Sequence, residues 1–209
     1  MNISFRPSKY NSAFVQNEFA PTLRICCQAF FILTALFTAF AFVKPDYFLS
    51  FAENLSALLE NNFDTVELDR SFDTFSLIFS GNLQAAAATA IYGFFPFIYL
   101  PASALGINAF TLVSAGAYFL RSGNTLPAYL AGILPHGIFE IPALLYACAI
   151  GICHCKLIVC AILHREQPAP WREQIVSLSM VFVSIVVPLF LIAALIETFV
   201  TPSLLALFV

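Results

Sequence analysis

Three ionisable side chains stand inside apolar stretches of this 209-residue chain: His136, Glu140 and Glu197. A charge at the centre of a bilayer costs roughly 2.5–3.5 kcal/mol on insertion scales, so each group needs a partner or a polar cavity. His136 and Glu140 are four residues apart and therefore share one face of a helix. One imidazole and two carboxylates are compatible with a structural tie between helices, an ion or proton site, or a divalent-metal site.

Of these alternatives the structural tie is favoured, with Asn82 and Asn108 extending the polar cluster. The order His136-Gly-Ile-Phe-Glu140 differs from the His-Glu-x-x-His of zinc proteases, and no second histidine lies one turn away. The sequence therefore predicts no catalytic residue, no metal and no cofactor. A transport site and a metal or catalytic site are the weaker hypotheses for the same residues.

A second group of candidate ligands lies at Cys153-His154-Cys155, with Cys148 and Cys160 on either side. This spacing matches no common zinc pattern, and a continuous helix would spread the side chains around its circumference. We expect these cysteines to behave as small apolar side chains and to form no disulfide framework.

The composition indicates which elements must position these residues. The chain is 60% hydrophobic and only 10% charged, whereas a soluble domain is about one quarter charged. Charge-free runs of about 20 residues are long enough to cross a bilayer as helices. The net charge is −3 and no basic patch is present, which argues against a nucleic-acid partner.

The sequence predicts an all-α, polytopic membrane bundle. The expected spans, about five, cover residues 25–43, 75–95, 96–120, 126–155 and 175–199. An unwound turn is expected in the third span, at Pro101, Gly106 and Asn108. A short re-entrant or tilted piece is expected at residues 126–134, before Pro135. The small residues of 81–93 suit a close contact within the bundle or between two copies, so a homo-oligomer is left open.

The remaining segments are a basic arm, residues 1–24, and an acidic insert, residues 44–74; everything from 25 to 209 is one transmembrane domain. Apolar residues recur at helical spacing through 47–60, which predicts a short amphipathic helix at the membrane interface.

The distribution of basic residues predicts the orientation. Six of the nine basic residues fall in the arm and in the connector 156–172: Arg6, Lys9, Arg24, Lys156, Arg165 and Arg172. The positive-inside rule places both segments in the cytoplasm. Five spans would then put the acidic insert and the C-terminus outside the cell membrane.

The decapeptide Leu134-Pro-His-Gly-Ile-Phe-Glu-Ile-Pro-Ala143 resembles the Pro-His-Gly-x-x-Glu-x-Pro-Ala core of the stage II sporulation protein M family. The segment from Ile196-Glu197 to Thr201-Pro202 is similar to the C-terminal Ile-Glu-x-x-x-Thr-Pro of that family. Gly81-Asn82-Leu83 is similar to the start of the family's second helix. The resemblance covers about residues 75–202. It departs at Ala109, where the family usually has Gly, and at 152–155, where it tends to have Leu-Arg-Leu-Gly.

The resemblance implies a multi-pass membrane protein without established enzymatic activity. The member that names the family is the membrane anchor of two peptidoglycan-degrading proteins at the engulfing septum. We therefore expect a non-enzymatic scaffold in sporulation or other envelope processes. It would sit in the lipid bilayer, and its protein partners would be peptidoglycan-remodelling proteins. The acidic insert would be the surface on which these proteins dock. The alternative is a small transporter or channel with the His136, Glu140 and Glu197 site.

Overall fold

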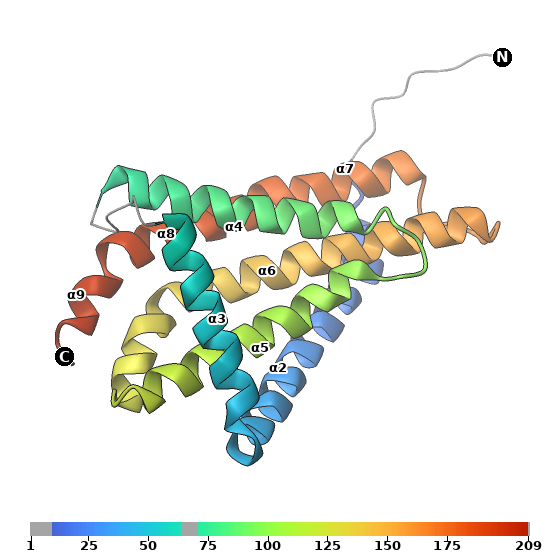
Figure 1. Ribbon diagram of the computed structural model, residues 1–209. Coiled ribbons are helices and arrows are strands. Elements are labelled where there is room, and N and C mark those ends of the chain that lie inside the picture. The colour runs from blue at the N-terminus through green and yellow to red at the C-terminus, as the bar shows by residue number, and fades with distance from the viewer. Residues whose placement is uncertain (1–9, 64–70, 209) are drawn as a thin grey trace.

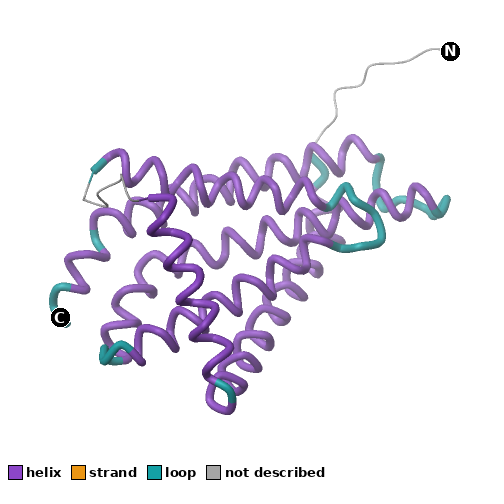
Figure 2. Tube along the Cα trace, viewed as in Figure 1, coloured by secondary structure: helices purple, strands orange, loops and turns teal. Residues whose placement is uncertain are grey.

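The first apolar run forms a long helix that ends, as predicted, before Pro45. The computed structural model describes residues 10–63 and 71–208, and within these ranges the chain forms helices and no strands (Figures 1 and 2). A short helix, α1 (Ser12–Phe14), and a π-helical segment, η1 (Val15–Phe19), lead into α2 (Ala20–Val43). Pro45 cannot continue α2, because it has no N–H to donate to the preceding turn.

Helix α3 (Pro45–Phe63) is the predicted amphipathic helix and crosses the other helices at a steep angle (Figure 1). Phe48, Leu49 and Ala52 are buried on one face. The Phe48 ring lies 4.7 Å from the Phe110 ring, centroid to centroid, and therefore ties α3 to the helix beneath it. Its position at a membrane interface stays a prediction.

The remaining helices surround α6 (Leu126–Ile162), which is 37 residues long. α6 packs against α2, α4, α5, α8 and α9. Its central residues Ala147 to Gly151 are almost fully buried, and most of them are small. The bounds of the other elements are α4 Phe72–Tyr92, α5 Leu100–Arg121, α7 Trp171–Val181, η2 Phe182–Val186, α8 Val187–Phe199 and α9 Thr201–Leu205.

Four of the described helices are long and apolar enough to cross a membrane, so the expected count of about five is corrected to four. They are Ser12–Val43, Leu100–Arg121, Leu126–Ile162 and Trp171–Phe199. The helix that does not qualify is α4, where a span over 75–95 was expected. Asn82, Gln84 and several hydroxyl residues make α4 more polar than the other four. It nevertheless packs along α6 and α8.

The two interruptions expected in the spans are absent. α5 begins at Leu100 with Pro101 in its first turn, where the missing N–H costs nothing, and it continues unbroken through Gly106 and Asn108. α6 is also continuous, so residues 126–134 form its first turns and not a separate re-entrant piece. Figure 1 shows that these turns (yellow) lie at an angle to the rest of α6, as a helix bent at an internal proline does.

The last long helix contains a π-helical segment, η2, immediately before Pro188. Because Pro188 has no N–H, the carbonyl of Ser184 lacks its usual helical donor. The wider π turn accommodates the missing hydrogen bond, and the helix continues into α8.

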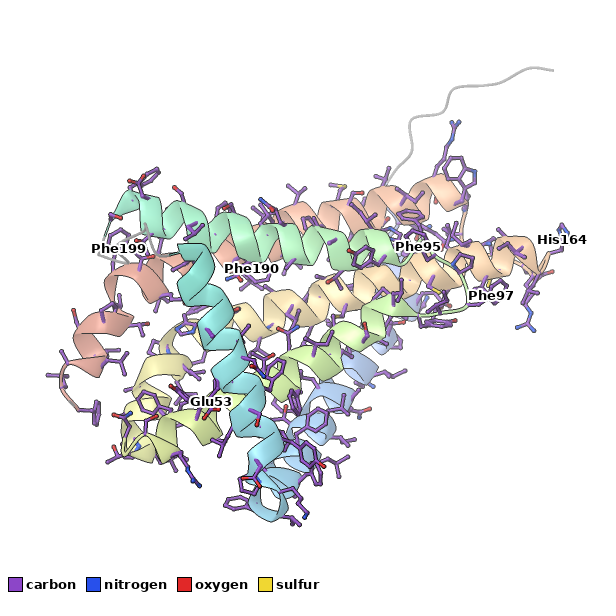
Figure 3. The ribbon with its side chains drawn as sticks, viewed as in Figure 1. Glu53, Phe95, Phe97, His164, Phe190 and Phe199 are labelled. Carbon is purple, nitrogen blue, oxygen red and sulfur yellow. The ribbon has the colours of Figure 1, made fainter. Side chains whose placement is uncertain are left out.

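The loops gather at two opposite ends of the bundle (Figure 1). The start of α2, the loop 93–99 and the turn near His164 lie at one end, and α3, the α5–α6 turn and α9 lie at the other (Figure 3). The described part of the predicted arm, residues 10–24, therefore lies at the same end as the 156–172 connector, and residues 1–9 lie outside the described residues. Which end faces the cytoplasm stays a prediction.

A close backbone approach joins the end of α4 to α6. A methyl group added at Gly93 would overlap the carbonyl of Gly151. One added at Gly151 would lie 2.5 Å from the carbonyl oxygen of Thr89 and 2.6 Å from Cγ of Pro101. Glycine is therefore required at both positions for α4, α5 and α6 to meet here.

We predict that Gly151→Ala lowers the free energy of unfolding by about 1–3 kcal/mol, because the new methyl group overpacks this contact. Gly106→Ala is the matched control, since nothing lies within 4 Å of a methyl group there. Thermal unfolding in detergent, followed by the fluorescence of Trp171, the single tryptophan, measures both. Equal midpoints for the two variants would contradict the prediction.

Candidate functional site

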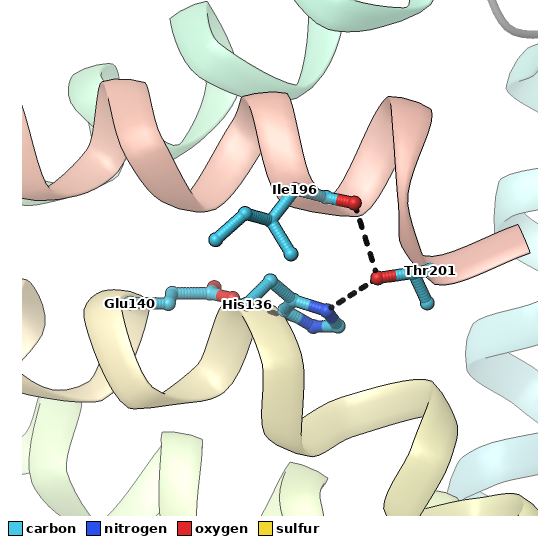
Figure 4. Close-up of polar contacts among 4 residues, drawn as sticks. All are labelled: His136, Glu140, Ile196 and Thr201. Carbon is cyan, nitrogen blue, oxygen red and sulfur yellow. Dashed lines mark hydrogen bonds and ion pairs between the residues drawn. The ribbon is translucent and has the colours of Figure 1, made fainter. Parts of the chain in front are cut away.

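The bend in α6 positions two of the candidate residues. Pro135 and Pro142 both lie inside the helix, so the carbonyls of Ala131 and Ile138 have no helical N–H partner. His136 follows the first of these prolines directly, and Glu140 lies one turn further on. Figure 4 shows both side chains on the face of α6 that looks toward the last long helix.

The facing side of the site comes from the end of α8 and the start of α9. Glu197 lies in the last turn of α8, and Thr201 is the first residue of α9. α9 fits closely against α6, because a methyl group added at Gly132 would lie 3.2 Å from the Leu205 side chain. Residues more than 50 positions apart in the sequence are thereby held together at one end of the bundle.

The His136 imidazole, the Glu140 carboxylate and the Glu197 carboxylate form one cluster. Each offers a ligand atom, and these three atoms all lie within 4.8 Å of one another. Nε2 of His136 is 3.9 Å from Oε2 of Glu140. The three residues are partly buried, with side-chain exposures of 13% for His136 and 35% for Glu140.

The contacts of Thr201 favour one tautomer of the neutral imidazole. Its hydroxyl donates to the carbonyl of Ile196 at 3.3 Å, so the oxygen accepts from Nδ1–H of His136 at 3.4 Å (Figure 4). In a neutral imidazole the other nitrogen, Nε2, then carries the lone pair. That lone pair lies on the side of the ring nearer the carboxylates.

The structure does not join the two predicted asparagines to this cluster. Asn108 is exposed, and its Nδ2 donates to the carbonyl of Ala104 in its own helix at 2.8 Å. Asn82 is partly buried on α4, and no hydrogen bond connects it to the other three residues. The described contacts join only His136, Glu140 and Glu197, and the extension to the two asparagines stays a prediction. Membrane depth alone does not determine which face of a helix a residue occupies.

Thr201 is the contact that reasoning from the sequence missed. A signal was present: Thr201-Pro202 follows Glu197 within about one turn, and Pro in the first turn starts a new helix. A helix that restarts there turns its first side chains back toward Glu197.

His154 belongs to a separate, mainly apolar environment. Its Nδ1 lies 3.0 Å from the carbonyl oxygen of Ala90, and its ring stacks on Phe94 with centroids 4.4 Å apart. All six cysteines are free. Cys153 and Cys155, on either side of His154, are buried, as expected for small apolar side chains.

We predict that Thr201→Val destabilises the fold by about 1–3 kcal/mol, because Nδ1–H of His136 loses its acceptor. Thr201→Ser keeps the hydroxyl and should remain close to the wild type. The comparison is made by thermal unfolding of the three proteins in the same detergent. If serine and valine have the same effect, the hydroxyl does not matter and the role assigned to it is wrong.

Comparisons with known proteins complete the description of the chain. No curated protein and no solved structure matches it. The family model of stage II sporulation protein M matches residues 27–202, which include the bend of α6, all three cluster residues and Thr201. This match covers most of the chain and agrees with the resemblance carried by the decapeptide 134–143. The chain is therefore a membrane protein of the stage II sporulation protein M family.

Proposed function

We propose that this protein is a non-enzymatic membrane anchor that holds peptidoglycan-remodelling proteins at the cell envelope. Family membership over residues 27–202 supports a sporulation-related membrane protein. In the anchoring role, the four apolar helices would hold the protein in the bilayer. Its partners would carry out the remodelling of peptidoglycan.

The observation that carries this proposal is the exposed face of α3. Asp46, Ser50 and Asn54 are exposed along one side of the helix at spacings of four residues. The opposite side is held by Phe48, which is fully buried against Phe110. A polar face on a firmly packed helix suits protein docking, because little conformational entropy is lost when a partner binds.

The position of α3 supports the same role. α3 lies across one end of the bundle, and the residues that follow it, 64–74, continue the acidic insert. With the basic end in the cytoplasm, as the positive-inside rule predicts, this surface would face the cell wall. Wall-directed partners would then reach it without crossing the membrane.

The transport alternative has less support. Four cavities among the described residues are lined by none of His136, Glu140 and Glu197. α5 and α6 are continuous, whereas transporter sites are typically built from discontinuous helices.

We predict that neutralising the insert abolishes co-purification of peptidoglycan-degrading enzymes with this protein from cross-linked membranes. The variant carries Asp64→Asn, Glu67→Gln, Asp69→Asn and Asp73→Asn; the first three positions lie outside the described residues. Removing four negative charges eliminates the electrostatic complementarity that steers a partner to the surface.

The control for this experiment is Glu166→Gln, an exposed carboxylate in the connector that follows His164, at the opposite end of the bundle from α3 (Figure 3). Equal amounts of both variants in the membrane fraction are verified before recovery is compared. Undiminished recovery with the insert variant would show that the acidic insert is not the docking surface.

A further inference from the structure

We propose that His136, Glu140 and Glu197 bind one divalent transition-metal ion, which clamps the bend of α6 to the end of α8. This site goes beyond the anchoring role and does not rest on it. Three features of the cluster favour a metal ion: the positions of the ligand atoms, the tautomer of the imidazole and the charge balance.

The ligand atoms are already close to a coordination geometry. Around a tetrahedral ion with bonds of roughly 2.0–2.1 Å, two ligand atoms lie about 3.3 Å apart. Nε2 of His136 and Oε2 of Glu140 are 3.9 Å apart, and all three ligand atoms lie within 4.8 Å of one another. Small side-chain rotations of the two glutamates therefore close the site without moving a helix.

The imidazole is prepared to coordinate through Nε2. Metal-bound histidines commonly donate their second ring N–H to a hydrogen-bond acceptor, which fixes the tautomer and the ring orientation. Here the Thr201 hydroxyl accepts from Nδ1–H, and the Ile196 carbonyl in turn orients the hydroxyl. The three-member chain leaves the Nε2 lone pair on the side of the carboxylates.

The charges of the cluster call for a cation. Neither Glu140 nor Glu197 forms an ion pair with a Lys or Arg in the described part of the chain. Two ionised carboxylates in an apolar segment are costly without compensation. One divalent ion balances both charges, and the site is then neutral overall.

The donor set selects the kind of ion. Mg²⁺ and Ca²⁺ prefer six or more oxygen ligands, whereas one imidazole and two carboxylates suit Zn²⁺, Mn²⁺ or Fe²⁺. Zinc is the probe of choice because it accepts nitrogen and carboxylate donors at low coordination number. Three protein ligands leave one position of a tetrahedral ion for water.

The test measures metal in the isolated protein. The full chain is purified in detergent with an affinity tag that contains no histidine, stripped with a chelator and titrated with Zn²⁺ in excess Mg²⁺. We expect one zinc per wild-type chain by elemental analysis, and a loss of binding of at least tenfold in Glu140→Gln and in Glu197→Gln. His154→Gln, which changes another buried histidine of the same helix, should keep full stoichiometry.

Thr201 provides a more selective readout, because among the three proposed ligands it is hydrogen-bonded only to the imidazole. Thr201→Val should weaken zinc binding by about 10- to 100-fold, as loss of an outer-shell partner typically does. Thr201→Ser should restore binding. A polar tie that binds no metal would give the same zinc occupancy in both variants.

Thermal unfolding keeps the proposal testable where a variant folds poorly. Zinc should raise the unfolding midpoint of the stripped wild type and leave that of Glu140→Gln unchanged. A stripped wild type that binds less than a tenth of an equivalent of zinc and shows no shift would overturn the proposal. Because these measurements need no partner protein, their outcome is independent of the co-purification experiment.

Discussion

The structure depends on how closely other helices approach α6. Lipid tails are as apolar as leucine, so the hydrophobic effect does little to hold membrane helices together, and dense packing has to contribute instead. The small residues of 147–151 in the middle of α6 bring α4 and α5 within van der Waals distance. Toward its other end, α6 packs its first turns against α9, where the polar cluster forms.

The polar cluster is a consequence of the prolines in α6. A regular helix hides its backbone polar groups from the membrane, but Pro135 and Pro142 leave two carbonyls without helical partners and bend the axis. The bend sends the first turns of α6 toward α9 and keeps the remaining turns against α8. Histidine and glutamate are tolerated there because the other helices screen them from the lipid.

Much of the fold was predictable from the sequence. Charge-free runs gave the helical class and most of the long helices, and Pro45 gave the junction between α2 and α3. Periodicity did not predict that α4 is less apolar than a typical membrane span and still belongs to the bundle. α4 is held in place by packing against α6 and α8. The i, i+4 relation of His136 and Glu140 follows from local geometry. The approach of Glu197, the contribution of Thr201 and the exposure of Asn108 depend on how distant helices are rotated toward one another.

The loop 93–99 has a consequence for the depth of the protein in the membrane. Phe97 and Tyr99 have positive φ angles of 69° and 49°, a conformation that L residues rarely adopt. The strained loop displays Phe95, Phe97 and Ile98 at the end of the bundle that also holds His164 (Figure 3). Aromatic rings favour the boundary between acyl chains and headgroups. We therefore expect this loop to lie at the membrane boundary on the side of the bundle opposite α3, and to fix how deeply the bundle is inserted.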